Sequence, residues 1–95
     1  MHSELEKELA DQKSNFKKEI EFINQNQKAK FILDLAFRNR DIELYESMLT
    51  RFYGKRILKQ LLHYRLLAIR HTYTDNEARS MEITGLGAWI LEQQG

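Results

Sequence analysis

The sequence contains no cysteine, no proline and no valine among its 95 residues. Without cysteine, the chain cannot form a disulfide, a thiolate zinc site or a thiol nucleophile. No uninterrupted apolar run reaches ten residues, whereas a transmembrane helix needs about 20. The first residues are charged, which argues against a signal peptide. We therefore expect a soluble protein without a membrane partner, in the cytoplasm or another intracellular compartment.

The absence of proline and valine, together with abundant leucine, glutamate, lysine, glutamine and arginine, favours helix along the whole chain. No stretch alternates apolar and polar residues for long enough to predict a strand. A chain of this length forms one domain in most proteins. The sequence therefore predicts an all-α fold: a single helical domain over residues 1–95, built as a small bundle of four to five helices from which a long N-terminal helix can project.

Apolar residues at helical spacing and capping residues divide the chain into five predicted helices. The approximate ranges are 3–23, 28–38, 42–53, 55–71 and 74 onward. Gly54 is the predicted stop of the third helix. The second helix carries apolar residues in nearly every direction, so we expect it at the centre of the core. Gly85 and Gly87 interrupt the last helix, which either breaks there or uses the missing side chains for close packing.

The net charge of +1 conceals a basic centre. Residues 28–71 carry ten bases and four acids, whereas residues 1–27 carry six acids and four bases, and residues 72–95 carry four acids and one base. No acid occurs between Glu46 and Asp75. A helix over 55–71 places its apolar residues on one face. Opposite them, within about 60° of one another, lie Arg56, Lys59, His63 and Arg70.

This cationic face is the best candidate for contact with phosphates, since each lysine or arginine can neutralise one phosphate. The alternative is that acidic segments of the same molecule, or of another subunit, neutralise the face. A phosphate-binding face must be exposed and must not be covered by the acidic N-terminal segment or tail. The predicted nucleic-acid or anion contacts are Arg51, Lys55, Arg56, Lys59, His63 and Arg70.

A helix-turn-helix that reads DNA sequence fits less well. Gly54 stands between the third and fourth helices, but the preceding Arg51, Phe52 and Tyr53 are bulky, where this motif favours a tight turn with small residues. The turn at Gly85 is followed by an apolar segment unsuited to a groove. The sequence therefore favours phosphate contact over sequence-specific reading.

Large apolar residues near the chain ends predict contact with a protein partner or with a second copy. Leu9 and Phe16 lie near heptad spacing on the first helix, and Trp89 and Ile90 stand close to the C-terminus. The alternative for the C-terminal residues is that they pack into the core of their own chain. We therefore predict Leu9, Phe16, Trp89 and Ile90 as partner contacts.

Two charged residues fall among apolar positions: Asp34 on the second helix and Arg65 on the fourth. A charge in a core is tolerated only when it is paired and hydrogen-bonded. We therefore predict a structural ion pair between Asp34 and Arg65, with exposure of each at the rim of the core as the alternative.

Catalytic groups are scarce. His63 and His71 lie eight residues apart, which is about 12 Å along a helix, so they cannot share one metal. No serine has an adjacent histidine or the turn of a nucleophile elbow. We expect no enzymatic activity, no metal, no cofactor and no small-molecule substrate.

The sequence thus predicts a non-enzymatic, small helical adaptor or regulatory protein that acts by binding a macromolecular partner. The alternative is a nucleic-acid-binding protein that contacts phosphates through the basic helix 55–71. This ranking depends on one premise, that apolar and cationic side chains lie on opposite sides of a single helix over 55–71.

Overall fold

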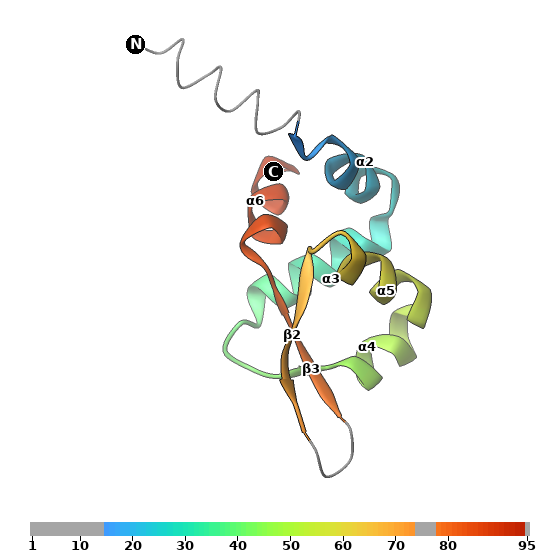
Figure 1. Cartoon of the computed structure of the whole chain (residues 1–95), viewed down its shortest axis with the longest axis vertical. Helices are drawn as coiled ribbons and strands as arrows, with labels where there is room; N and C mark the ends of the chain where they lie inside the picture. The colour runs from blue at the N-terminus through green and yellow to red at the C-terminus, as the bar shows by residue number, and fades with distance from the viewer. Residues whose placement is uncertain (1–14, 74–77, 95) are drawn as a thin grey trace.

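The computed structural model describes residues 15–73 and 78–94 (Figure 1). Within these ranges the chain forms five helices and a three-stranded antiparallel sheet, so the all-α prediction is wrong. In chain order the elements are α2 (Lys17–Gln25), α3 (Gln27–Arg38), β1 (Leu44–Tyr45), α4 (Glu46–Tyr53), α5 (Lys55–His63), β2 (Leu67–Thr72), β3 (Arg79–Ile83) and α6 (Gly85–Gln94).

The sheet has the strand order β1-β3-β2, and both pairs are antiparallel. Strands β2 and β3 form a hairpin that projects away from the helices (Figure 1). Its register shifts between Ile69, which pairs with Met81, and His71, which pairs with Ser80. Arg70 is therefore an extra residue in β2, a β-bulge that interrupts the alternation of side chains along the strand.

The predicted helix 55–71 ends at His63, and its last eight residues belong to a turn and to β2. After α5, the amide of Leu66 donates to the carbonyl oxygen of Leu61 at 2.9 Å, and the amide of Arg65 donates to that of Leu62 at 3.1 Å. The backbone of Arg65 adopts the left-handed conformation, with φ of 60°. These bonds form a Schellman motif, in which buried Leu61 and Leu66 supply the usual apolar contact.

The predicted last helix is also corrected, because residues 79–83 form the central strand and α6 begins only at Gly85. Thr84 caps α6: its hydroxyl oxygen accepts a hydrogen bond from the amide of Gly87 at 3.0 Å. The same hydroxyl donates to the carbonyl oxygen of Arg65 at 2.6 Å. One threonine therefore joins the start of α6 to the turn after α5. Ser3 and Thr74, the first residues of the first and last predicted helices, lie outside the described residues.

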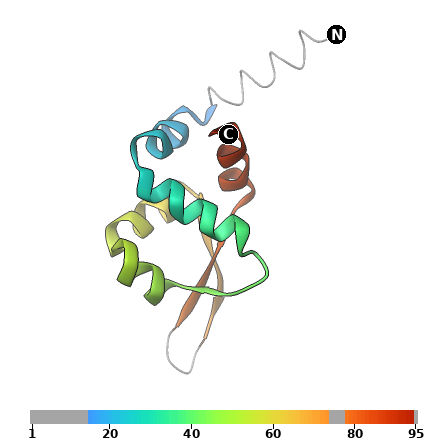
Figure 2. The ribbon, with the colours of Figure 1, turned by 180° about the vertical axis from the view of Figure 1, so that it is seen from behind.

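Helix α3 runs across the sheet and beside α6 (Figure 2). It buries Ala29, Ile32 and Leu33 completely, as expected for a helix at the centre of the core, whereas Phe31 is 57% exposed, so one side of α3 faces solvent. The largest fully buried apolar side chains come from α2 to α6, from the turn after α5 and from both strands of the hairpin: Ile23, Ile32, Leu33, Leu49, Leu61, Leu66, Leu67, Met81 and Ile90.

Helices α4 and α5 are joined by Gly54 alone. Gly54 has φ of 95° and ψ of 151°, a backbone region that essentially only glycine occupies. The predicted stop at Gly54 is confirmed. Phe52, one of the bulky residues before the turn, is 73% exposed. Its side chain therefore does not obstruct the turn.

Candidate nucleic-acid interface

The surface of interest is the outer side of α5. Its inner side carries three residues in the core, Ile57, Leu58 and Leu61. Because these residues fix the rotation of the helix about its axis, the residues on the opposite side of the helical wheel must face solvent. We call the basic face the four exposed side chains that result: Lys55, Arg56, Lys59 and His63.

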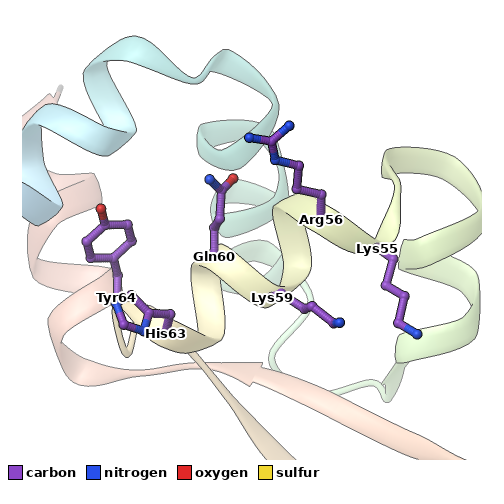
Figure 3. Close-up of a pocket in the computed structure, with 6 residues that line it drawn as sticks. All are labelled: Lys55, Arg56, Lys59, Gln60, His63 and Tyr64. Carbon is purple, nitrogen blue, oxygen red and sulfur yellow. The ribbon is translucent and has the colours of Figure 1, made fainter.

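Figure 3 shows how these side chains are arranged. Lys55, Lys59 and His63, spaced four residues apart, point to one side of the helix, and Arg56 points to the other. Gln60 and Tyr64 continue the Arg56 row and are half-buried. Together the two rows line a surface hollow along α5. The basic face is therefore a strip of cations about two turns long, with a polar edge.

A second hollow adjoins the first and extends the surface to the hairpin. It is lined by Ser47, Thr50 and Arg51 of α4, by Lys55, and by residues at the start of β3. Lys55 belongs to both hollows. Arg51 is exposed. The cationic surface therefore continues from α5 over α4 towards the hairpin, and it carries two hydroxyl groups that can donate hydrogen bonds to an anion.

The side of this second hollow nearest the hairpin is held by an ion pair. Two nitrogens of the Arg79 guanidinium contact the carboxylate of Glu46: Nε lies 2.5 Å from Oε2, and Nη2 donates to Oε1 at 2.7 Å. The hydrogen bond from Arg79 to the Glu46 carboxylate raises the pKa of Arg79. The pair joins the first residue of α4 to β3, and it neutralises Glu46, the acid that lines this hollow.

No carboxylate neutralises the basic face in the described ranges 15–73 and 78–94. The ion pairs found there are Arg38 with Asp34 and Arg79 with Glu46. Lys55, Arg56 and Lys59 take part in neither. The acids of residues 1–14 and 74–77 lie outside the described residues.

Arg70 does not join the basic face, so the prediction that it shares one helical face with Arg56, Lys59 and His63 is wrong. It lies on β2 rather than on α5, at the bulge, and its Nη1 donates to the backbone carbonyl oxygen of Arg40 at 3.2 Å. The side chain thus reaches the loop after α3. The premise that Lys59 and Arg70 share one helix fails, and with it the ranking of an adaptor above a nucleic-acid binder.

The predicted ion pair between Asp34 and Arg65 is replaced by a local one. Asp34 Oδ2 lies 3.1 Å from Arg38 Nε, one turn along α3. Among the described residues, no ion pair involves Arg65, whose side chain is exposed at the turn after α5. Each charge therefore reaches the surface, which was the stated alternative.

Two of the predicted partner contacts pack against each other inside this chain. The rings of Phe16 and Trp89 meet edge to face, with centroids 6.0 Å apart. Ile90 is completely buried in the core of its own chain, so it is not available to a partner. Leu9 lies outside the described residues.

A cluster that the sequence did not reveal lies beside β1, next to the end of β2. Both carboxylate oxygens of Glu43 accept hydrogen bonds from tyrosine hydroxyls, one from Tyr45 at 2.9 Å and one from Tyr73. Donation from Tyr73 and then Tyr45 holds the pKa of Glu43 below its usual value of 4.5. Tyr73 lies thirty residues from Glu43, so no local pattern could indicate the contact.

The described part of the chain contains neither a candidate metal site nor a candidate membrane-spanning helix. No group of three or more histidine, aspartate or glutamate side chains is placed to hold a metal ion. Among the same residues, none of the helices has both the length and the apolar character needed to cross a membrane. Comparisons of the chain with protein-family models, with curated proteins and with solved structures find no match.

Proposed function

We propose that this protein binds double-stranded DNA, with α5 in the major groove and the basic face towards the phosphates and bases. The observation that carries the proposal is the outward orientation of Lys55, Arg56 and Lys59. All three are exposed on one helix, and none is neutralised by a carboxylate of the described residues.

The arrangement of elements supports this proposal. Helices α4 and α5 with the turn at Gly54 form a helix-turn-helix, and the β2–β3 hairpin follows directly. This order of elements, with a strand before α4, is that of winged helix-turn-helix domains. In helix-turn-helix proteins the second helix lies in the major groove while the first crosses the backbone. Because one fold serves many functions, the arrangement supports the proposal only together with the cationic side chains.

The dimensions of nucleic acids favour DNA over RNA. The major groove of B-form DNA is about 12 Å wide and admits a helix, whereas the major groove of A-form RNA is too deep and narrow for side chains to read. Arg51, Ser47 and Thr50 on α4 adjoin Lys55. They are suitably placed to hold the phosphate backbone beside that groove.

The test is a titration of the protein against a fluorescein-labelled 20-base-pair duplex at several salt concentrations. Four full cations, Arg51, Lys55, Arg56 and Lys59, are available to phosphates. At about −0.9 per contact, the logarithm of the binding constant should fall against the logarithm of salt with a slope between about −2.7 for three phosphate contacts and about −3.6 for four. Lys59→Gln should weaken binding and reduce this slope by about 0.9.

Lys30→Gln is the matched control, because it removes the same charge from an exposed lysine on α3, in a different hollow beside Phe31 and Leu91. It should leave the slope unchanged. If the wild-type protein binds no duplex at low salt, the proposal fails. It also fails if the two variants weaken binding equally, because net charge alone would then account for the affinity.

A second candidate function is the binding of a protein partner, as in the predicted adaptor. The observation that favours it is Phe31, which is 57% exposed on the outer side of α3 and lines a hollow with Leu91 of α6. A concentration-dependent increase in mass by light scattering, abolished by Phe31→Ser, would place self-association on this surface. A mass that stays at one chain for both proteins at all concentrations would contradict self-association there.

A further inference from the structure

We propose that the protein prefers DNA sites that contain guanine, and that Arg56 recognises the edge of the guanine base in the major groove. This inference rests on the proposed binding of DNA. The proposal concerns the chemistry of the side chains that α5 directs outwards. It goes beyond phosphate contact because it predicts which base the helix selects.

The exposed polar side chains in the first two turns of α5 carry only hydrogen-bond donors, whereas Gln60, which also carries an acceptor, is half-buried. The exposed polar side chains there are Lys55, Arg56 and Lys59, and neither lysine nor arginine has an acceptor. Guanine offers two acceptors, N7 and O6, at its major-groove edge. Adenine and cytosine each present an amino donor there, which would face donors of the protein without a partner. Thymine presents no donor but only one acceptor, O4. A donor-only surface therefore favours guanine, which presents two acceptors and no donor.

The side chains that could accept hydrogen bonds are less well placed. Gln60 stands at the edge of the basic face and is half-buried. His63 is exposed, but it is the last residue of α5, whereas base contacts in helix-turn-helix proteins come mainly from the first residues of the second helix. The pairing of adenine with an amide side chain, which is the usual alternative, is thus disfavoured here.

Arg56 is the strongest candidate among the three donors. It is the second residue of α5, and its guanidinium forms no ion pair or hydrogen bond with any described residue. A guanidinium can donate two parallel hydrogen bonds, which matches N7 and O6 of one guanine. Lys55 and Lys59 flank it on the opposite row. We assign these two lysines to phosphates, to which a lysine binds as a point charge.

The test uses two 20-base-pair duplexes of alternating guanine and cytosine, one natural and one in which 7-deazaguanine replaces every guanine. The analogue has a carbon in place of N7, so it loses one acceptor while charge, length and base pairing stay the same. Every base pair presents a guanine edge, so the register of binding does not matter. Wild-type protein should bind the natural duplex at least about fivefold more tightly, the lower bound for a bidentate contact.

Two variants locate the contact, as in a double-mutant cycle. Arg56→Ala should bind the natural and the deaza duplex equally, because alanine has no donor for N7. Arg51→Ala, the matched control, removes the same side chain and charge from an exposed arginine on α4. It should weaken binding to both duplexes by the same factor and keep their ratio.

The outcomes separate this inference from the proposed function. Salt-dependent binding with equal affinity for both duplexes would overturn guanine recognition and leave phosphate binding intact. A ratio that persists in Arg56→Ala would overturn the assignment to Arg56. Absence of binding to either duplex at low salt would instead reject the DNA-binding function itself, and the inference with it.

Discussion

Gly87 of α6 lies directly against the backbone carbonyl of Leu66, at the end of the turn after α5. A Cβ atom at position 87 would stand 2.4 Å from the oxygen of Leu66 and 2.9 Å from Cγ1 of Ile83. The amide of Thr84 also donates to the Leu66 oxygen, at 3.1 Å. The first turn of α6 therefore packs on the backbone that leads from α5 into β2, and only glycine permits this distance.

Gly87→Ala should destabilise the protein, because a methyl group so close to a backbone carbonyl forces the two segments apart. Overpacking of this kind costs about 1–3 kcal/mol, measurable as a lower midpoint of urea denaturation with unchanged slope. Gly85→Ala is the control, since a Cβ there meets nothing within 4 Å. It should leave the midpoint unchanged or raise it slightly, as alanine favours helix. Equal losses in both variants would contradict the packing argument.

Arg65→Gly should stabilise the protein. Arg65 occupies the C′ position of α5 with φ of 60°, where a side chain costs about 1 kcal/mol and glycine costs nothing. Because glycine also adds freedom to the unfolded chain, the net gain in the free energy of unfolding is expected to be a few tenths of a kcal/mol up to about 1. Arg65→Ala, which retains the Cβ, should give no gain. An unchanged or lower midpoint for Arg65→Gly would argue against the left-handed turn.

Arg65 also explains why the end of α5 could not be predicted. A glycine commonly follows the C-terminus of a helix, as Gly54 follows α4. Helix α5 ends at His63 instead, and Tyr64 and Arg65 follow it. The apolar residues beyond it, Ile69 among them, also fit the helical period of α5. The stop is set by tertiary packing of Leu66 into the core, which a local pattern does not contain.

The hairpin was missed for a related reason. The residues at 74–77 are threonine, aspartate, asparagine and glutamate, and such residues serve equally as helix caps and in turns. In β2, the bulge at Arg70 breaks the alternation that predicts a strand. Helices α3 and α4, the stop at Gly54 and the two faces of α5 as far as His63 could be predicted, because each depends on residues within two or three turns of one another.

The shared carboxylate of Glu43 predicts an unusual titration of Tyr73. Its hydrogen bond to Glu43 raises the pKa of Tyr73 to about 12, above the unfolded value of 10.0. The folded state thus favours the protonated phenol, so this contribution to stability is complete below pH 10 and is lost as the pH rises through about 12. Absorbance at the tyrosinate band should show one late titration that is absent in Tyr73→Phe.

Glu43→Gln should lower the pKa of Tyr73 towards its ordinary value, because an amide accepts a hydrogen bond without negative charge. For Glu43 itself the sign is reversed: its pKa is lowered below 4.5, so its contribution is present above that pH and is lost as the pH falls through the folded-state pKa. The wild-type protein should therefore lose stability in acid more steeply than Glu43→Gln. Identical acid profiles of the two proteins, or an unchanged Tyr73 titration, would contradict the shared hydrogen bonds.

Gly54→Ala tests whether the turn between α4 and α5 sets the direction of the basic face. A Cβ at Gly54 meets nothing within 4 Å, so the cost comes from φ of 95° alone and is about 1–3 kcal/mol. The chain can relieve this strain only by changing the turn, which rotates α5 relative to α4 and separates Lys55 and Lys59 from Arg51. We therefore expect lower stability together with weaker binding to duplex DNA at a temperature where the variant is folded.

Gly87→Ala, destabilised by a similar amount through α6, is the matched control and should bind DNA more tightly than Gly54→Ala does. If the two variants lose affinity equally, general loosening of the fold explains the effect, and the turn has no separate part in orienting the cations.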